Sequence, residues 1–169
     1  MGMMRKLLMG GTSGERTLVS TTTATTSTTA MPAMVMKVGA AYSVSWAGTI
    51  PSSNYGTYYL FEILGGYSTL SGMCYAKLEK SGAKRSLSIA LLGTSLYSAT
   101  VSVGDSIALE LRFKINTVSA SSPYYTMDVE LYVNGEQAVS GTRLGTTDAG
   151  NGLRYYNNAA GTFIIKKLS

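Results

Sequence analysis

Hydrophobic and polar residues alternate along much of the chain from residue 42 onward. In the segment 106–115, isoleucine, leucine or phenylalanine occupies every second position from Ile107 to Ile115, which is the period of a half-buried β-strand. Other strand-like segments, separated by Gly, Pro, Asn or Ser, are 42–46, 57–64, 72–79, 85–92, 97–103, 125–133 and 162–168. No helical stripe accompanies them. The pattern predicts an all-β protein, an antiparallel β-sandwich of the jelly-roll type.

The best-patterned segment is YTMDVELYVNGEQAVSG, residues 125–141. Asn134-Gly135 is typical of a two-residue type I′ turn, so the segment should form a hairpin. The residues expected to face inward are Val129, Leu131 and Val133. Asp128 and Glu130 fall on the opposite face of the strand, where we expect solvent.

The first forty residues differ from the rest. Residues 20–30 are Thr, Ser and Ala throughout, and MPAMVM follows at 31–36. Such a tract lacks the apolar surface to fold alone, so it is either a flexible linker or an extended arm that lies on a neighbouring subunit. We favour the arm, and predict residues 1–40 as an extended N-terminal arm and 41–169 as the sandwich domain. The residues expected to make the assembly contacts are Thr21, Thr22, Thr23, Met31, Met34 and Met36.

Composition excludes several function classes. The chain has no histidine and a single cysteine, Cys74, which removes Ser-His and Cys-His catalysis, His-based metal sites and an intramolecular disulfide. The net charge of +5 is spread thinly, unlike the dense basic stripe of a nucleic-acid-binding protein. No apolar run approaches the roughly 20 residues of a membrane-spanning helix. The apolar part of the start, Leu7-Leu8-Met9, is too short for a signal peptide, so we expect no Sec cleavage.

The order of segments resembles a known family. A long alternating strand at 107–115, a polar break, and then VELYVNGEQAVSG at 129–141 resemble the concanavalin A-like, laminin-G-like jelly roll, in which a strand ends in an LYVNG or LYVDG turn. The resemblance covers about residues 40–169. It implies a fold shared by glycan-binding modules, glucanases and structural domains. The family's glucanases carry a Glu-x-Asp-x-x-Glu pattern. Here Asp128 and Glu130 give one carboxylate pair, and positions 126 and 133 are Thr and Val, so the three-carboxylate pattern is absent.

The resemblance also implies where ligands would bind. Calcium is common in the family, and the loop 146–152 offers oxygen ligands at Asp148 and Asn151; ordinary turn chemistry explains the same residues. No other cofactor is expected. A sugar site needs an aromatic platform, for which we single out Trp46, Tyr155 and Tyr156, although paired tyrosines also serve strand packing. The wider set of aromatic candidates is Tyr58, Tyr59, Tyr124 and Tyr125.

Three hypotheses about function follow. The first is a non-enzymatic structural protein of a bacteriophage particle, a homo-oligomer on the capsid or tail surface of the virion, with other virion subunits as partners and neither nucleic acid nor membrane bound. The alternative is a carbohydrate-binding adhesin module of the laminin-G-like type, with a glycan as partner. The third is a glycan hydrolase that uses Asp128 and Glu130, whose separation along the strand does not by itself exclude the pair.

Overall fold

The computed structural model describes residues 14–24, 27–31, 33–52, 56–65, 71–81, 84–150 and 153–169. In these residues the chain forms strands and no helix. The strands are β1 (Arg16–Thr21), β2 (Thr29–Ala30), β3 (Ala41–Thr49), β4 (Thr57–Gly65), β5 (Ser71–Ser81), β6 (Lys84–Leu91), β7 (Thr94–Val101), β8 (Ser106–Val118), β9 (Tyr125–Val133), β10 (Glu136–Gly145), β11 (Arg154–Asn157) and β12 (Gly161–Lys167).

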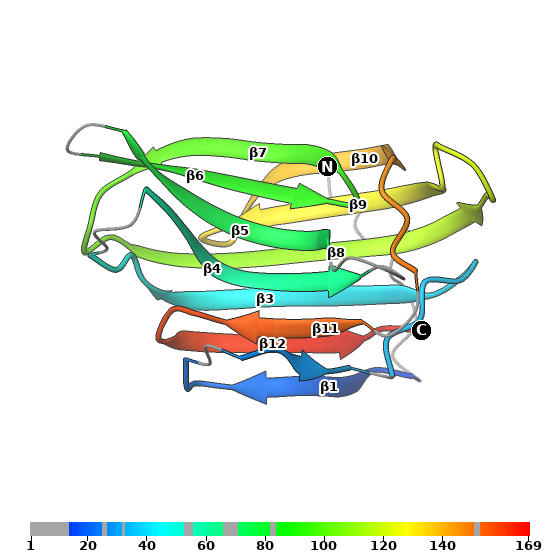
Figure 1. Ribbon diagram of the computed structural model, residues 1–169, viewed down its shortest axis with the longest axis horizontal. Coiled ribbons are helices and arrows are strands. Elements are labelled where there is room, and N and C mark those ends of the chain that lie inside the picture. The colour runs from blue at the N-terminus through cyan, green and yellow to red at the C-terminus, as the bar shows by residue number, and fades with distance from the viewer. Residues whose placement is uncertain are drawn as a thin grey trace.

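The strands form two layers (Figure 1). Sheet A has the order β1-β12-β3-β8-β9-β10, and sheet B has the order β2-β11-β4-β5-β6-β7. Every strand pairing is antiparallel. The predicted fold class, an all-β antiparallel sandwich, is confirmed.

The core lies between the two sheets and is built by the inward side of the alternating pattern. Phe61 of sheet B stacks on Phe163 of sheet A, with ring centroids 5.1 Å apart. Tyr42 and Phe113 meet in the same layer at 5.8 Å. Trp46 of β3 is fully buried among them. Burial of these large apolar side chains is the main favourable term for the fold.

The hairpin predicted around Asn134-Gly135 is present. Val133 pairs with Glu136 across the turn, and both turn residues have positive φ, 51° and 80°, as a type I′ turn requires. Val129 and Leu131 are buried, and Val133 packs against the core. The inward face of this strand is therefore as predicted.

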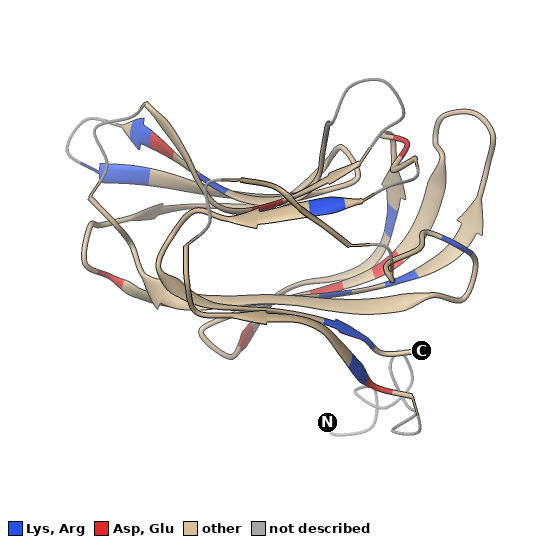
Figure 2. Cartoon of the chain, turned by 60° about the horizontal axis from the view of Figure 1, so that its bottom comes forward, with Lys and Arg blue, Asp and Glu red and all other residues tan. Residues whose placement is uncertain are grey.

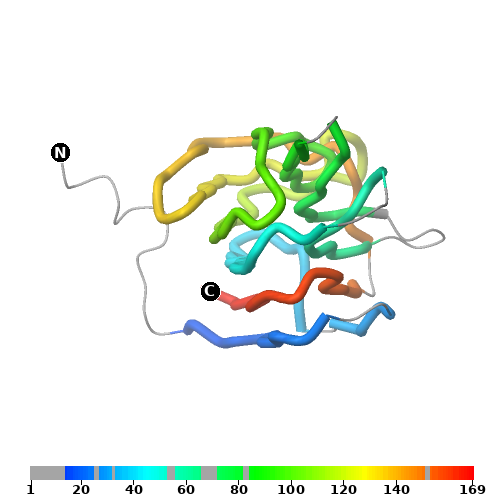
Figure 3. Tube along the Cα trace, turned by 90° about the vertical axis from the view of Figure 1, so that its left-hand side faces the viewer, coloured from blue at the N-terminus to red at the C-terminus, as the bar shows by residue number. Residues whose placement is uncertain are grey.

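The N-terminal segment is extended, and two of its parts are strands of the sandwich itself. β1 pairs with β12, with Thr21 opposite Phe163, and the two run side by side in Figure 3. β2 pairs with β11 through Thr29 and Ala30. Residues 1–40 are therefore not all outside the sandwich.

The methionines expected to contact a neighbouring subunit serve their own core. Met31 and Met34 are each 3% exposed, and Met36 packs against the same cluster. Their burial corrects the prediction that these methionines contact another chain. To reach another chain they would have to leave their own core, which would expose apolar surface to water. Thr22 and Thr23 are exposed. No helix long and apolar enough to cross a membrane occurs in the described residues.

Candidate functional site

Trp46, the first residue predicted to contact a sugar, points into the core instead. Its relative exposure is 0%. The indole ring lies so close to Gly48 and Gly161 that a Cβ at either residue would come within 2.8 Å of it. These two glycines make room for the ring between the sheets. Trp46 therefore supports the fold and offers no surface platform, which corrects its assignment.

Tyr155 and Tyr156 are neighbours on β11 and face opposite sides of sheet B. Tyr155 lies on the inner side, where its ring meets Phe163 at 5.8 Å. Tyr156 lies on the outer side and contacts Tyr59 of β4. Only the second member of the pair is placed on the outer face.

Three half-buried tyrosines meet on that outer face. The Tyr59 ring makes edge contacts with Tyr75 of β5, at a centroid distance of 5.7 Å, and with Tyr156, at 6.4 Å. Both contacts are near-perpendicular, with interplanar angles of 85° and 74°, which is a favoured arrangement of aromatic rings. We call Tyr59, Tyr75 and Tyr156 the tyrosine platform.

A carboxyl group lies within the platform. Glu62 of β4 pairs across the strands with Tyr75 on one side and Tyr156 on the other. The Tyr156 hydroxyl donates a hydrogen bond to Oε2 of Glu62. Oε1 occupies space above Gly72, where a Cβ would stand only 2.6 Å from it. Glu62 is 8% exposed, so the rings and the strand floor hold the carboxyl nearly out of water.

This burial changes the acid–base properties of the cluster. Desolvation raises the pKa of Glu62, and the hydrogen bond from Tyr156 partly opposes that rise. Desolvation, together with the nearby Glu62 carboxylate, also raises the pKa of Tyr156 and of Tyr59. Glu62 thus keeps a proton to a higher pH than an ordinary glutamate, and the phenols keep theirs.

Lys77 of β5 lies at the edge of the platform. Its Nζ is 5.7 Å from the centroid of the Tyr75 ring and 2.9 Å from Oε1 of Glu79. The hydrogen bond to Glu79 raises the pKa of Lys77. The face therefore combines aromatic rings, one sequestered carboxyl group and one fixed ammonium group.

In the loop predicted to bind calcium, the Asp148 carboxylate is hydrogen-bonded to neighbouring groups of the chain. Oδ1 of Asp148 accepts hydrogen bonds from the Tyr125 hydroxyl at 3.1 Å and from the Gly150 amide at 3.0 Å. Asn151 lies outside the described residues. No group of three or more acidic or cysteine side chains with metal-binding geometry occurs in the described part of the chain. Asp148 therefore anchors the loop through these two hydrogen bonds.

Asp128 and Glu130, the pair considered for glycan hydrolysis, lie on the other side of the molecule, on the outer face of sheet A. Asp128 accepts a hydrogen bond from Thr142 at 2.8 Å. Glu130 accepts one from the Tyr132 hydroxyl at 3.2 Å and is 8% exposed. Neither carboxylate contacts the tyrosine platform.

Sequence reasoning missed Glu62, Tyr75 and Lys77. Strict alternation along TYYLFEIL puts Tyr59 and Glu62, three residues apart, on opposite faces. The pairing of β4 with β5 shifts between Tyr59 and Phe61, and such a bulge lets both side chains share the outer face. The adjacent tyrosines Tyr58 and Tyr59 of β4 were the available signal.

No protein-family model and no curated protein sequence matches the chain. Solved structures do resemble it. Alginate lyase Aly36B is 12% identical, with a TM-score of 0.45 over 90% of this chain and 77% of that one. The Caenorhabditis elegans galectin LEC-6 is 11% identical, with a TM-score of 0.40 over 91% and 94%. The family 18 polysaccharide lyase aly-SJ02 is 10% identical, with a TM-score of 0.44 over 75% of this chain and 53% of that one.

These similarities concern the fold. All three proteins are jelly-roll β-sandwiches. The antiparallel sandwich of this chain is shown by its own two sheets, and its resemblance to the concanavalin A-like jelly roll in particular stays a prediction. The prediction of a non-enzymatic bacteriophage structural protein is withdrawn, since nothing found indicates a bacteriophage role; the lyase and galectin names describe the similar proteins, which are alginate lyases and a galectin. The burial of Met31 and Met34 in their own core also removes two of the assembly contacts that the structural hypothesis expected.

Proposed function

We propose that the chain binds a glycan on the outer face of sheet B, at the tyrosine platform. The observation that carries this proposal is the meeting of three half-buried tyrosine rings around the carboxyl group of Glu62. A pyranose ring has an apolar C–H face and a rim of hydroxyl groups. The rings match the apolar face, and the polar groups at the edge match the hydroxyls.

The polar surface continues from the platform across the sheet, which suits a chain of sugars. Tyr59 pairs with Lys77, Lys77 with Ser88 of β6, and Ser88 with Ser98 of β7. Leu87 and Ile89 are buried, so Ser88 between them faces outward. A linear glycan laid along this row meets an aromatic surface first and then an ammonium group and hydroxyls.

Glycan-array screening followed by calorimetry tests the proposal. Tyr59→Ala should lower the affinity for a bound glycan at least about tenfold, because it removes the ring shared by both edge contacts. Alginate belongs among the probes because structures of the same fold are alginate lyases. Tyr155→Phe is the control, since it changes an inward tyrosine of β11, the strand that carries the platform residue Tyr156. Binding that is equal in Tyr59→Ala and the parent protein would contradict the proposal.

A second candidate function, cleavage of the bound glycan, is favoured by the hydrogen bond between Tyr156 and Glu62. Glu62 lies beside a phenol, and the Glu79 carboxylate at the edge of the platform is paired with Lys77, whereas glycoside hydrolysis ordinarily uses two carboxyl groups that flank the scissile bond. One base and one acid suffice for elimination from a uronate. Ionised Glu62 takes the proton from C5, O4 leaves with the proton of Tyr156, and a C4=C5 double bond forms. The proton on Glu62 then returns to Tyr156 along their hydrogen bond.

This second candidate is tested by the ultraviolet absorbance of the new double bond, which is conjugated with the uronate carboxylate. Glu62→Gln should abolish the absorbance change and leave binding of the uronate polymer largely intact, because the amide keeps the shape of the side chain and loses its basicity. Binding without any absorbance change in the parent protein would leave the chain as a glycan-binding module. Product formation that survives in Glu62→Gln would remove Glu62 from the reaction.

A further inference from the structure

A groove of about 650 Å³ lies on the outer face of sheet A, on the side of the sandwich opposite the tyrosine platform. Its volume is in the range of sites for small organic ligands. It crosses strands β12, β3, β8 and β9. The side chains that line it and matter here are Ser43, Ser45, Glu110, Arg112, Tyr132 and Lys166.

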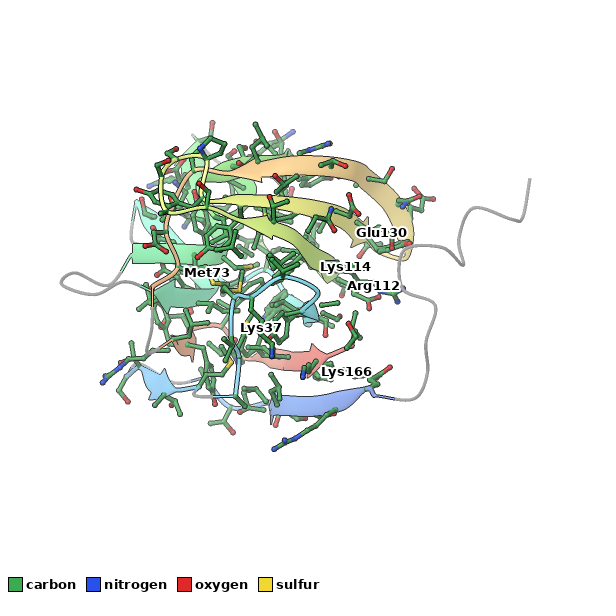
Figure 4. All side chains as sticks on the ribbon, turned by 90° about the vertical axis from the view of Figure 1, so that its right-hand side faces the viewer. Lys37, Met73, Arg112, Lys114, Glu130 and Lys166 are labelled. Carbon is green, nitrogen blue, oxygen red and sulfur yellow. The ribbon has the colours of Figure 1, made fainter. Side chains whose placement is uncertain are left out.

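The groove exists because neighbouring strands carry side chains of different length. The outward positions of β3 in this region are Ser43, Ser45 and Ala47, and these small residues form the floor. In register with the two serines, β12 presents Lys166 and Ile164. On the other side of β3, strands β8 and β9 carry the long side chains of Glu110, Arg112 and Tyr132. Figure 4 shows Lys166, Arg112 and Glu130 along the same side of the molecule.

The polar groups of the groove are already paired with one another. Nε of Arg112 lies 2.8 Å from Oε1 of Glu110, and the Ser43 hydroxyl donates to the same oxygen at 3.2 Å. Nζ of Lys166 lies 2.6 Å from Oε1 of Glu15. The Arg112 guanidinium also lies over the Tyr132 ring, 5.3 Å from its centroid. The charges of the groove are therefore close to balanced.

This balance decides the class of ligand. An anion that approaches Arg112 also approaches Glu110 and Glu130, and a cation that approaches Glu110 meets Arg112 and Lys166. Figure 2 shows the same interspersion of basic and acidic residues over the molecule. An apolar ligand would leave the charged groups and serine hydroxyls without water. A neutral ligand rich in hydroxyl groups pairs with donors and acceptors alike.

A protein strand does not fit the same place. β3 is an interior strand whose backbone pairs with β12 on one side and with β8 on the other. Addition of a peptide strand needs an unpaired sheet edge. A ligand in the groove is therefore recognised by side chains: the stacked Arg112 and Tyr132 form one flat wall, and the serines form the floor.

We infer that this groove is a second carbohydrate site, which binds a neutral oligosaccharide independently of the tyrosine platform. The two sites lie on opposite outer faces of the sandwich, so one molecule holds two glycan chains. The inference does not depend on the function proposed for the platform. Each site is removed by its own substitutions.

Calorimetry with neutral oligosaccharides of glucose, mannose and galactose, and with alginate oligosaccharides as the charged comparison, tests the inference. Ser45→Phe fills the floor of the groove and should weaken binding of a neutral oligosaccharide at least about tenfold. Arg112→Ala, which is less disruptive, should weaken it by about three- to tenfold through loss of the flat wall. Thermal denaturation checks that both variants fold. Tyr59→Ala, on the opposite face, should remove only binding at the platform and leave binding at the groove unchanged.

The outcomes separate this inference from the proposed function. Neutral-oligosaccharide binding that is lost in Ser45→Phe and Arg112→Ala and kept in Tyr59→Ala supports the second site. Binding that is lost only in Tyr59→Ala overturns it and leaves the platform as the sole site tested. Binding of charged oligosaccharides alone, lost in Arg112→Ala, overturns the neutral ligand class. Absence of binding of every neutral oligosaccharide in the parent protein also overturns it.

Discussion

The tyrosine platform of sheet B and the groove of sheet A use similar residue types, Tyr, Glu and a basic side chain, under different physical conditions. In the platform, Glu62 is nearly buried and receives a hydrogen bond from Tyr156. In the groove, Glu110 and Arg112 form an ion pair in which each side chain is 36% exposed. Desolvation makes polar contacts strong and their loss costly, whereas water weakens the exposed pair.

This difference means that the two faces should respond differently to the same kind of substitution. A change in the platform should affect folding stability as well as ligand binding, because its groups are packed against one another. A change in the groove should affect ligand binding with little effect on stability. Paired substitutions on the two faces test the comparison directly.

The largest expected effect is that of removing a platform ring. Tyr59→Ala eliminates two edge contacts, at 5.7 and 6.4 Å, and should lower the free energy of unfolding by about 1–3 kcal/mol, since each aromatic pair contributes about 0.5–1.5 kcal/mol. Tyr132→Ala, in the groove, loses the contact with Arg112 and the hydrogen bond to Glu130 and should cost less, about 1–2 kcal/mol. Urea denaturation of both variants measures the difference. Equal losses would show that the two faces are held alike.

The next effect comes from removing one hydroxyl group. Tyr156→Phe leaves Glu62 without the donor to Oε2, and an unsatisfied buried polar group costs about 1–3 kcal/mol. Tyr155→Phe is the control on the same strand, because that tyrosine packs against Phe163 through its ring, and it should change stability by less than about 0.5 kcal/mol. Matching losses in the two variants would mean that the bond between Tyr156 and Glu62 adds nothing.

A smaller effect should appear in the pH dependence of stability. Burial raises the pKa of Glu62 above its ordinary value of 4.5, so the folded state holds this proton more tightly than the unfolded chain. Stability should therefore fall as pH rises from that value to the raised pKa, and the loss is complete above it. Glu62→Gln should flatten this part of the profile, and Glu79→Gln should not. An unchanged profile in Glu62→Gln would exclude burial of the carboxyl as the cause.

The part of the fold that the sequence could predict is the part set by local pattern. Alternation predicted most strands and the hairpin at Asn134-Gly135, because period-2 burial is a local property of the chain. It did not predict that β1 and β2 join the sheets, since their Thr-rich sequence lacks an apolar stripe and their pairing with β12 and β11 spans more than a hundred residues.

The site was harder to predict than the fold. Tyr156 was identified by residue type, while Trp46 had the same chemistry and proved to be buried. The difference depends on two glycines, Gly48 and Gly161, that admit the indole ring between the sheets. Tyr59 and Glu62 share a face because of a register shift in β4. Sequence spacing contains neither the bulge nor the packing partner.

The smallest expected effect is that of breaking the exposed ion pair in the groove. Glu110→Gln removes the charge that Nε of Arg112 faces at 2.8 Å, and exposed pairs contribute at most about 1 kcal/mol. The loss should shrink further in about 1 M salt, where charges are screened within roughly 3 Å. Denaturation of Glu110→Gln at low and high salt measures both quantities. A salt-independent loss as large as that of Tyr156→Phe would mean that the groove is held together as the platform is, and the contrast between the two faces would no longer stand.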